Sequence, residues 1–159
     1  MGGREIQGSW ELSIDRAPAE VFGILVDFER YLAQWAQGPV SAEKVTPGEI
    51  GGGTRFVVTA KLVGLPVRSP YLVTNFERER RFGGDGVAGP VRFSEEYRLD
   101  ADGERGSSTK LRYTMRARPR GPFRIVEGPI SSHLRKLIGA DLGRFKALVE
   151  RERSGDRAG

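Results

Sequence analysis

The sequence contains no cysteine, which excludes disulfide bonds, thiolate nucleophiles and thiolate metal sites. A single histidine, His133, also excludes a metal site built from several imidazole ligands. No apolar run approaches the roughly 20 residues of a membrane-spanning helix. The opening MGGREIQGSW has no apolar stretch of the kind found in signal peptides. We therefore predict a cytoplasmic protein without a metal ion or another cofactor.

Lysine is scarce, because five of the 26 basic residues are lysines and the other 21 are arginines. The formal net charge is +5, and such an excess can attract nucleic acid, anionic lipid or acidic ligands. The chain has no block of five consecutive like charges. We interpret the excess as a compositional preference for arginine, glycine and alanine rather than as a binding tract.

A basic stripe follows the predicted last strand and its exit. Its members are Lys110, Arg112, Arg116, Arg118, Arg120 and Arg124. Proteins that bind single-stranded nucleic acid place aromatic side chains among the basic ones, and the outward positions of this strand provide none. We therefore expect no nucleic acid partner. A transient contact with a membrane surface is an alternative use of the stripe, and the oligomeric state is left open.

The length of 159 residues suits one domain with a substantial core and is short for two. The chain shows no internal repeat. We predict a single domain over residues 1–159, with its folded core in residues 5–152 and a frayed polar tail at 153–159.

The first quarter of the chain predicts one strand and two short helices. Residues 5–14, EIQGSWELSI, alternate apolar and polar side chains with the period of a half-buried strand. Pro18 suits the first position of a helix, and apolar side chains then recur at helical spacing through Val26. A second short helical segment is expected from Phe28 to Trp35.

From Val40 onward the pattern changes to strands separated by turns. The segments with strand character are 40–47, 54–63, 67–78, 80–82, 91–100 and 109–119. Pro70, inside the third segment, indicates an edge or a bulge. With the strand at 5–14, these segments predict an antiparallel sheet of about seven strands.

Residues 84–89, GDGVAG, match the GxGxxG pattern of dinucleotide-binding proteins. That pattern binds a pyrophosphate where it joins a strand to a helix. Here Pro90 and another predicted strand follow, so we interpret GGDGVAG as a hairpin loop. The glycines at 51–53 lack the Lys-Ser/Thr of a phosphate-binding loop and are interpreted as a turn.

After Pro119 the pattern becomes helical. From Ser131 onward, apolar residues repeat at intervals of three and four, which predicts one amphipathic helix of about five turns. Gly128-Pro129 is expected at its start or at a kink. The side chains expected to face the sheet are Leu134, Ile138, Leu142, Phe145 and Val149. A sheet with one apolar face needs such a cover, so the predicted fold class is α+β.

Glu95 breaks the alternation of its strand, VRFSEEYRLD at 91–100. It shares a phase with Phe93 and Tyr97, which are on the apolar side. A carboxylate that faces a core is costly unless it is paired, protonated or solvated. The position therefore indicates an interior that tolerates a polar group.

The order of these elements resembles the START-like (SRPBCC) superfamily of helix-grip proteins, and more closely its polyketide cyclase/dehydrase and lipid-transport branch. The stretches that carry the resemblance are IDRAPAEVFGILVDFERYLAQW, GEIGGGTRF, YLVTNFERERRF, YRLDADGERGSSTKLRYTM and LGRFKALVERE. The resemblance implies a curved antiparallel sheet that grips the long C-terminal helix, with a cavity between them. It spans residues 5–152 and is more specific for fold than for function.

In a protein of this resemblance, inward side chains of the later strands would contact a ligand. The predicted ligand-binding residues are Trp35, Phe93, Glu95, Tyr97, Tyr113 and Met115. Whether Tyr71 also points inward is left open, because its strand carries apolar residues on both sides. Glu95 is the candidate catalytic acid or base, with a structural role as the alternative. His133 beside Ser132 does not form a plausible triad, because neighbouring helical residues do not face each other.

We expect the protein to bind or carry a hydrophobic small molecule, such as a lipid, a quinone or a polyketide, in the internal cavity. An aromatic polyketide cyclase or dehydratase is the second hypothesis, since the superfamily includes such enzymes. A protein- or ribosome-interaction module that uses the basic surface is the third.

Overall fold

The computed structural model describes residues 5–36, 38, 40–62, 65–88, 91–119 and 128–156. Its elements are β1 (Ile6–Ile14), α1 (Pro18–Val26), α2 (Phe28–Trp35), β2 (Val40–Lys44), β3 (Arg55–Leu62), β4 (Leu65–Glu77), β5 (Arg81–Ala88), β6 (Val91–Asp102), the 3-10 turn η1 (Glu104–Gly106), β7 (Ser108–Pro119) and α3 (Gly128–Asp156). The predicted α+β class and order of elements are confirmed.

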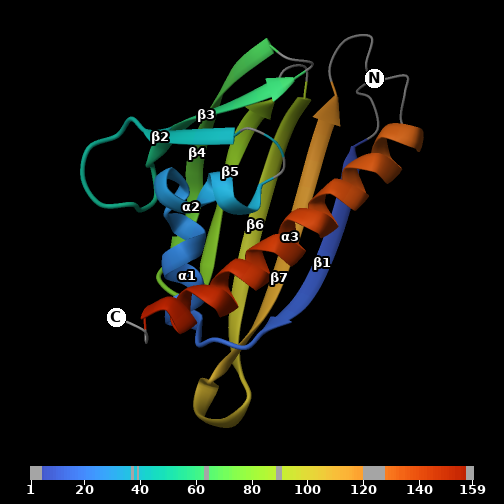
Figure 1. Cartoon of the computed structure of the whole chain (residues 1–159). Coiled ribbons are helices and arrows are strands. Elements are labelled where there is room, and N and C mark those ends of the chain that lie inside the picture. Colours follow the sequence, from blue (N-terminus) through green and yellow to red (C-terminus); the bar gives the residue numbers. More distant parts are fainter. Residues whose placement is uncertain are drawn as a thin grey trace.

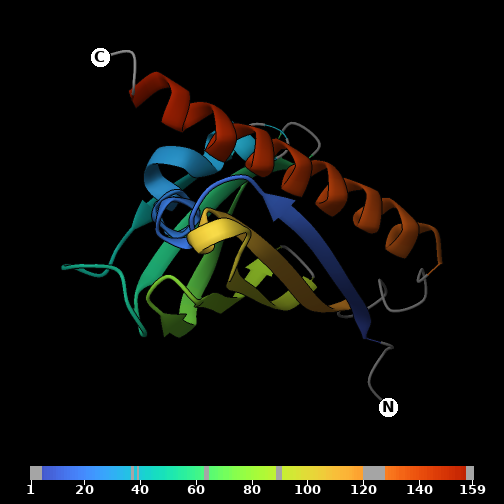
Figure 2. The ribbon, with the colours of Figure 1, turned by 90° about the horizontal axis from the view of Figure 1, so that it is seen from below.

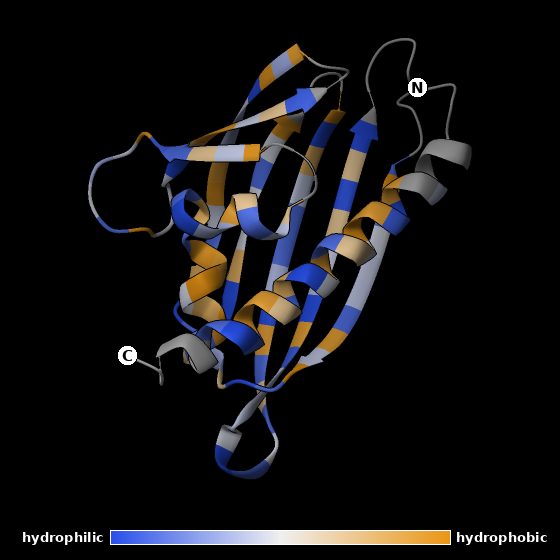
Figure 3. Ribbon diagram, viewed as in Figure 1, coloured by the Kyte–Doolittle hydropathy of each residue, from blue (hydrophilic) through white to orange (hydrophobic). Residues whose placement is uncertain are grey.

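The seven strands form one antiparallel sheet with the order β1-β7-β6-β5-β4-β3-β2. All neighbours except β1 and β7 are consecutive in the chain, so the sheet is a meander whose first strand closes against its last. Apolar and polar residues alternate along the strands (Figure 3), as a sheet with one covered face requires. The predicted number of about seven strands is confirmed.

Helix α3 crosses the inner face of the curved sheet, and α1 and α2 lie on the same side (Figures 1 and 2). Its side chains at Leu142, Phe145, Leu148 and Val149 are buried, while Leu134 and Ile138 are partly buried against the same core. The predicted sheet-facing side of the helix is therefore confirmed.

Helix α3 is longer than the predicted five turns, because it spans 29 residues from Gly128 to Asp156. Gly128-Pro129 marks its start, one of the two options. The helix extends over residues 153–156, which are part of the segment expected as a polar tail. The segment ERSGD contains no proline to end the helix, so the polar composition did not predict its end.

The largest correction concerns GGDGVAG, which was predicted to be a hairpin loop. Residues 83–88 belong instead to β5, where Gly83, Gly84 and Gly86 pair with β6. A Cβ atom on Gly84 would lie 2.3 Å from the carbonyl oxygen of Leu72 and 2.7 Å from the Tyr71 ring. These glycines are present because neighbouring groups approach the strand closely, not because the chain turns.

The pairing of β4 explains why its alternation of apolar and polar residues did not show which side faces inward. It pairs with β3 from Leu65 but with β5 from Tyr71, so Pro70 lies where β4 has one described neighbour, as an edge proline should. The β4–β5 register then shifts between Val73 and Asn75. A bulge of this kind moves the following residues to the opposite face, which places Phe76 inward against Phe22 and Phe82. Leu72 precedes the bulge and is an outward apolar residue. The apolar residues on both sides therefore have two causes.

We predict that Gly84→Ala destabilises the protein by about 1–3 kcal/mol, because the added methyl group would overlap backbone and ring atoms. Gly52→Ala is the control, since a Cβ there meets no atom within 4 Å. Chemical unfolding of both variants checks this. Equal stability of the two variants would show that β5 does not pack as described.

Candidate ligand-binding cavity

A cavity of about 350 Å³ lies between the sheet, α2 and α3. Its volume is at the lower end of the range for small-molecule sites. The walls are mainly apolar and aromatic. The lining residues are Phe28, Leu32, Trp35, Ala36, Val40, Val58, Tyr71, Phe93, Glu95, Tyr97, Tyr113, Ile138, Asp141 and Leu142.

Glu95 lies on this wall and is half-buried. The Tyr71 hydroxyl donates a hydrogen bond to its Oε2 at 2.8 Å, and the Tyr113 hydroxyl donates to its Oε1 at 2.9 Å. The inward orientation expected from the alternation of β6 is confirmed. In the described part of the chain these two phenols are the hydrogen-bond partners of the carboxyl group, and no arginine pairs with it.

The two tyrosines reach Glu95 from different strands. Tyr113 comes from β7, directly beside β6, where Glu95 pairs with Met115. Tyr71 comes from β4, so its hydroxyl must pass over β5 to reach β6. It can do so because β5 carries Gly84 opposite Glu95, and the Tyr71 ring occupies the space that a side chain at 84 would fill.

Burial controls the protonation of this cluster. Loss of water raises the pKa of Glu95, and the hydrogen bonds from Tyr71 and Tyr113 partly oppose that rise. Burial also raises the pKa of both phenols well above the usual value, with the nearby Glu95 charge as a further cause. The tyrosines therefore stay protonated as donors, and the folded protein favours the neutral form of Glu95 relative to a glutamate in water.

Tyr97 adds a further hydroxyl to the wall. Its ring packs on that of Tyr113 with centroids 4.6 Å apart, and its side chain is buried. Burial raises the pKa of Tyr97 well above the usual value, and the charges of Glu95 and Asp141 raise it further. Among the interactions of the described residues, this hydroxyl makes no hydrogen bond, so it is available to a ligand.

Trp35 ends α2 and closes one side of the cavity. Its ring packs edge-to-face on Phe145 of α3 at 5.2 Å, and Arg144 Nε donates to its carbonyl oxygen at 3.0 Å. Its buried indole N–H has no hydrogen-bond acceptor among the described residues. Trp35 therefore connects α2 to α3 as well as lining the cavity.

The structure brings five of the six predicted ligand-binding residues together on the cavity wall: Trp35, Phe93, Glu95, Tyr97 and Tyr113. Met115 is buried on the same face of β7 but is not part of the lining. Contact of any of them with a ligand stays a prediction.

Sequence reasoning did not identify Tyr71 and Asp141. The outward apolar Leu72 and the bulge after Val73 obscured the alternation of β4 and with it the orientation of Tyr71. The glycines opposite Tyr71 in β5 were the available signal. Asp141 is polar within an apolar helix face, and it forms an ion pair with Arg144. The side chain of His133 lies outside the described residues.

Among the described residues, no group of three or more acidic, histidine or cysteine side chains is arranged to hold a metal ion. None of the helices in the described part of the chain combines the length and hydropathy that a membrane crossing needs.

The sequence profile of the family described as "Polyketide cyclase / dehydrase and lipid transport" matches residues 8–150. The chain belongs to this family. No curated protein matches it by sequence.

Solved structures with the same fold include a START superfamily protein from Mycobacterium smegmatis, with a TM-score of 0.68 and 16% identity over 92% of this chain and 95% of that one. The Zhui aromatase/cyclase from Streptomyces sp. R1128 has a TM-score of 0.69 and 17% identity, over 93% and 95% of the two chains. Ara h 8.0201 has a TM-score of 0.70 and 16% identity over 92% and 98%. At such identities the likeness shows a shared helix-grip fold, and the family membership fits ligand binding or cyclase/dehydrase activity.

We predict that Glu95→Gln gains stability relative to the wild type as the pH rises. The folded-state pKa of Glu95 is raised, so the contribution of this group to stability is greatest below its unfolded value of about 4.3. That contribution falls as the pH rises from there through the folded-state value, by at most about 1.4 kcal/mol per pH unit. The glutamine variant lacks this loss.

Unfolding free energies of both proteins between pH 4 and 8 measure this difference. Glu96→Gln removes the neighbouring carboxylate, which forms an outer-face ion pair with Arg81 at 3.0 Å, and controls for a general charge effect. A difference between wild type and Glu95→Gln that stays constant with pH would contradict the proposed protonation.

Proposed function

We propose that the protein binds and carries a hydrophobic small molecule in the cavity between the sheet and α3. The observation that carries this proposal is the combination of largely apolar walls with a convergent polar cluster, Glu95, Tyr71 and Tyr113, on one wall. Ligand sites have this composition, because apolar surface supplies affinity and a few placed polar groups fix orientation.

The charge of the wall narrows the class of ligand. Its ionisable groups are Glu95, Asp141 and three tyrosines, and no described residue of the lining is lysine, arginine or histidine. An anionic ligand would have no cation to pair with inside a cavity that already penalises charge. The cavity therefore favours a neutral, largely aromatic or aliphatic molecule with a hydroxyl or carbonyl group that meets the Glu95 and Tyr97 end.

A matched pair of probes tests this preference. We expect 2-naphthol to bind and 2-naphthoate, which has a similar shape and a negative charge, to bind at least about tenfold more weakly, a difference of about 1.4 kcal/mol. Titration calorimetry measures both affinities, and native mass spectrometry of the freshly purified protein shows whether a neutral compound co-purifies.

A variant that fills the cavity locates the binding. Ile138→Trp places a large side chain on the cavity wall, whereas Ala140→Trp adds the same side chain at an exposed position of α3. We expect the first variant to abolish 2-naphthol binding and the second to retain it. Binding that survives Ile138→Trp in a folded protein would place the ligand elsewhere.

A polyketide cyclase or dehydratase is the second candidate. The specific observation in its favour is that burial favours a protonated Glu95 beside two phenol donors, an arrangement suited to general acid–base assistance of aldol closure or dehydration. An enzyme would convert a poly-β-ketone thioester faster than buffer does, and Glu95→Gln would lower that rate. A carrier would bind the compound without this effect.

A further inference from the structure

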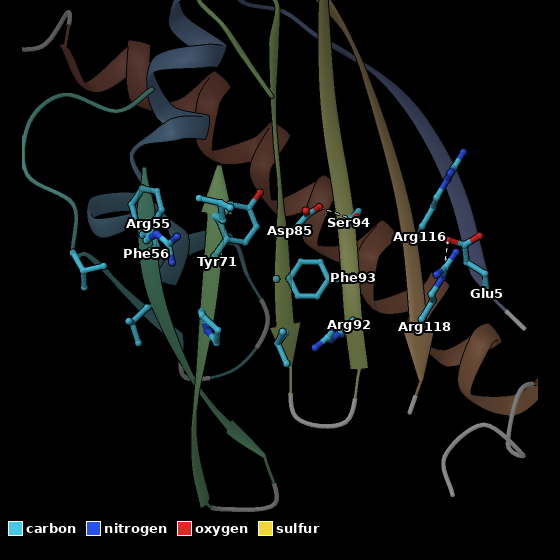
Figure 4. Close-up of a pocket in the computed structure, with 16 residues that line it drawn as sticks. Glu5, Arg55, Phe56, Tyr71, Asp85, Arg92, Phe93, Ser94, Arg116 and Arg118 are labelled. Atoms are coloured by element: carbon cyan, nitrogen blue, oxygen red, sulfur yellow. Dashed lines mark hydrogen bonds and ion pairs between the residues drawn. The ribbon is translucent and has the colours of Figure 1, made fainter. Parts of the chain in front are cut away.

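A second hollow lies on the outer face of the sheet, opposite α3. Figure 4 shows the strands in front and α3 behind them. Its volume is about 730 Å³, within the range of small-molecule sites. Four inward positions border it, Phe56, Tyr71, Gly86 and Phe93, and two of them, Tyr71 and Phe93, also line the inner cavity. Its other lining residues have outward side chains from five strands and from the positions next to β1 and β2: Glu5, Val45, Arg55, Val57, Pro70, Leu72, Asp85, Val87, Arg92, Ser94, Arg116 and Arg118.

The floor of this hollow is apolar. Val57, Leu72 and Val87 are half-buried on a face that no described helix covers. The outer face of an antiparallel sheet normally carries polar side chains where it meets water. Three branched residues at neighbouring positions of β3, β4 and β5 therefore form a small apolar surface.

Arginines flank the floor on both sides, with Arg55 on β3 and Arg92, Arg116 and Arg118 on β6 and β7 (Figure 4). Arg92 and Arg118 are direct cross-strand partners, and like charges in that position destabilise a sheet. Arg118 has an ion pair with Glu5 at 3.5 Å. Within the described residues, the guanidinium groups of Arg55, Arg92 and Arg116 have no hydrogen-bond or ion-pair partner.

The acidic groups near the hollow are already engaged. Asp85 accepts a hydrogen bond from the Ser94 hydroxyl at 2.7 Å, and Glu5 pairs with Arg118 and accepts from Gln7 Nε2 at 2.9 Å. Two carboxylates therefore face four guanidinium groups, and the excess lies at Arg92 and Arg116. A bound anion at this end would offset the repulsion between Arg92 and Arg118.

We propose that this outer hollow is a binding site for a single-chain anionic amphiphile, a molecule with one phosphate or carboxylate head and an apolar tail. The head pairs with Arg92 and Arg116, because guanidinium groups bind phosphate and carboxylate in bidentate fashion. The tail lies on Val57, Leu72 and Val87. The two cavities are thereby complementary: the inner one rejects anions and the outer one selects them.

Decyl phosphate, below its micelle concentration and at about 150 mM salt, is the probe that tests this site. We expect Arg92→Gln combined with Arg116→Gln to weaken its binding at least about tenfold, because hydrogen bonds to charged groups contribute about 1.5–3 kcal/mol. Arg98→Gln is the matched control, since Arg98 is an exposed outward arginine of the same strand outside the hollow. The affinity of the Arg98→Gln variant for decyl phosphate should stay within about twofold of that of the wild type, an effect of under about 0.5 kcal/mol.

Two further comparisons separate this site from its alternatives. Inorganic phosphate should bind at least about tenfold more weakly than decyl phosphate, because it cannot use the apolar floor. Ile138→Trp, which fills the inner cavity, should leave decyl phosphate binding unchanged while it removes 2-naphthol binding. The experiment therefore distinguishes a failure of the inner-cavity proposal from a failure of the outer-hollow proposal.

Three results would overturn the proposal. Equal weakening by Arg98→Gln would indicate general charge attraction, and loss in Ile138→Trp would place the amphiphile in the inner cavity. If decyl phosphate does not bind while vesicles of phosphatidylglycerol bind in an Arg92- and Arg116-dependent way, the face contacts a membrane surface rather than a single molecule.

Discussion

The polar end of the cavity depends on one carboxyl group held by two phenols from different strands. Glu95 on β6 accepts from Tyr113 on the adjacent strand and from Tyr71 two strands away. The second contact requires that β5 carry no side chain where the Tyr71 ring crosses it. The glycines of β5 and the protonation of Glu95 are therefore parts of one arrangement, in which the absence of side chains from part of a strand makes room for a polar cluster.

The two faces of the sheet have opposite chemistry. The inner face meets α2 and α3 around a cavity whose ionisable lining residues are acids and phenols. The outer face carries a hollow with four arginines and an apolar floor. A single sheet can hold both because successive side chains point to opposite faces, so Glu95 and its neighbour Ser94 belong to different environments. Under the two proposals, ligands of different charge bind on different sides of the sheet.

Most of the fold could be predicted from the sequence, because periodicity reports which side of an element is buried. The phase of β6 placed Glu95 in the interior, and the spacing of apolar residues identified α3 and its sheet-facing side. The sequence pattern gave wrong or ambiguous predictions where the same residues are compatible with two local structures. Glycines in β5 are typical of turns and also of close packing. In β4 the outward apolar Leu72 and the bulge after Val73 put apolar residues on both faces, which concealed the orientation of Tyr71. Neither can be resolved without knowing what lies across the sheet.

The protonation of Glu95 can be measured most directly by ¹³C NMR of its side-chain carboxyl carbon, assigned by its absence in Glu95→Gln. The account predicts a titration midpoint above that of an ordinary glutamate, since burial raises the pKa. It also predicts a further rise in Tyr71→Phe and in Tyr113→Phe, because each hydroxyl stabilises the ionised form. A midpoint at or below the ordinary value, unchanged in both phenylalanine variants, would contradict the cluster on which the account rests.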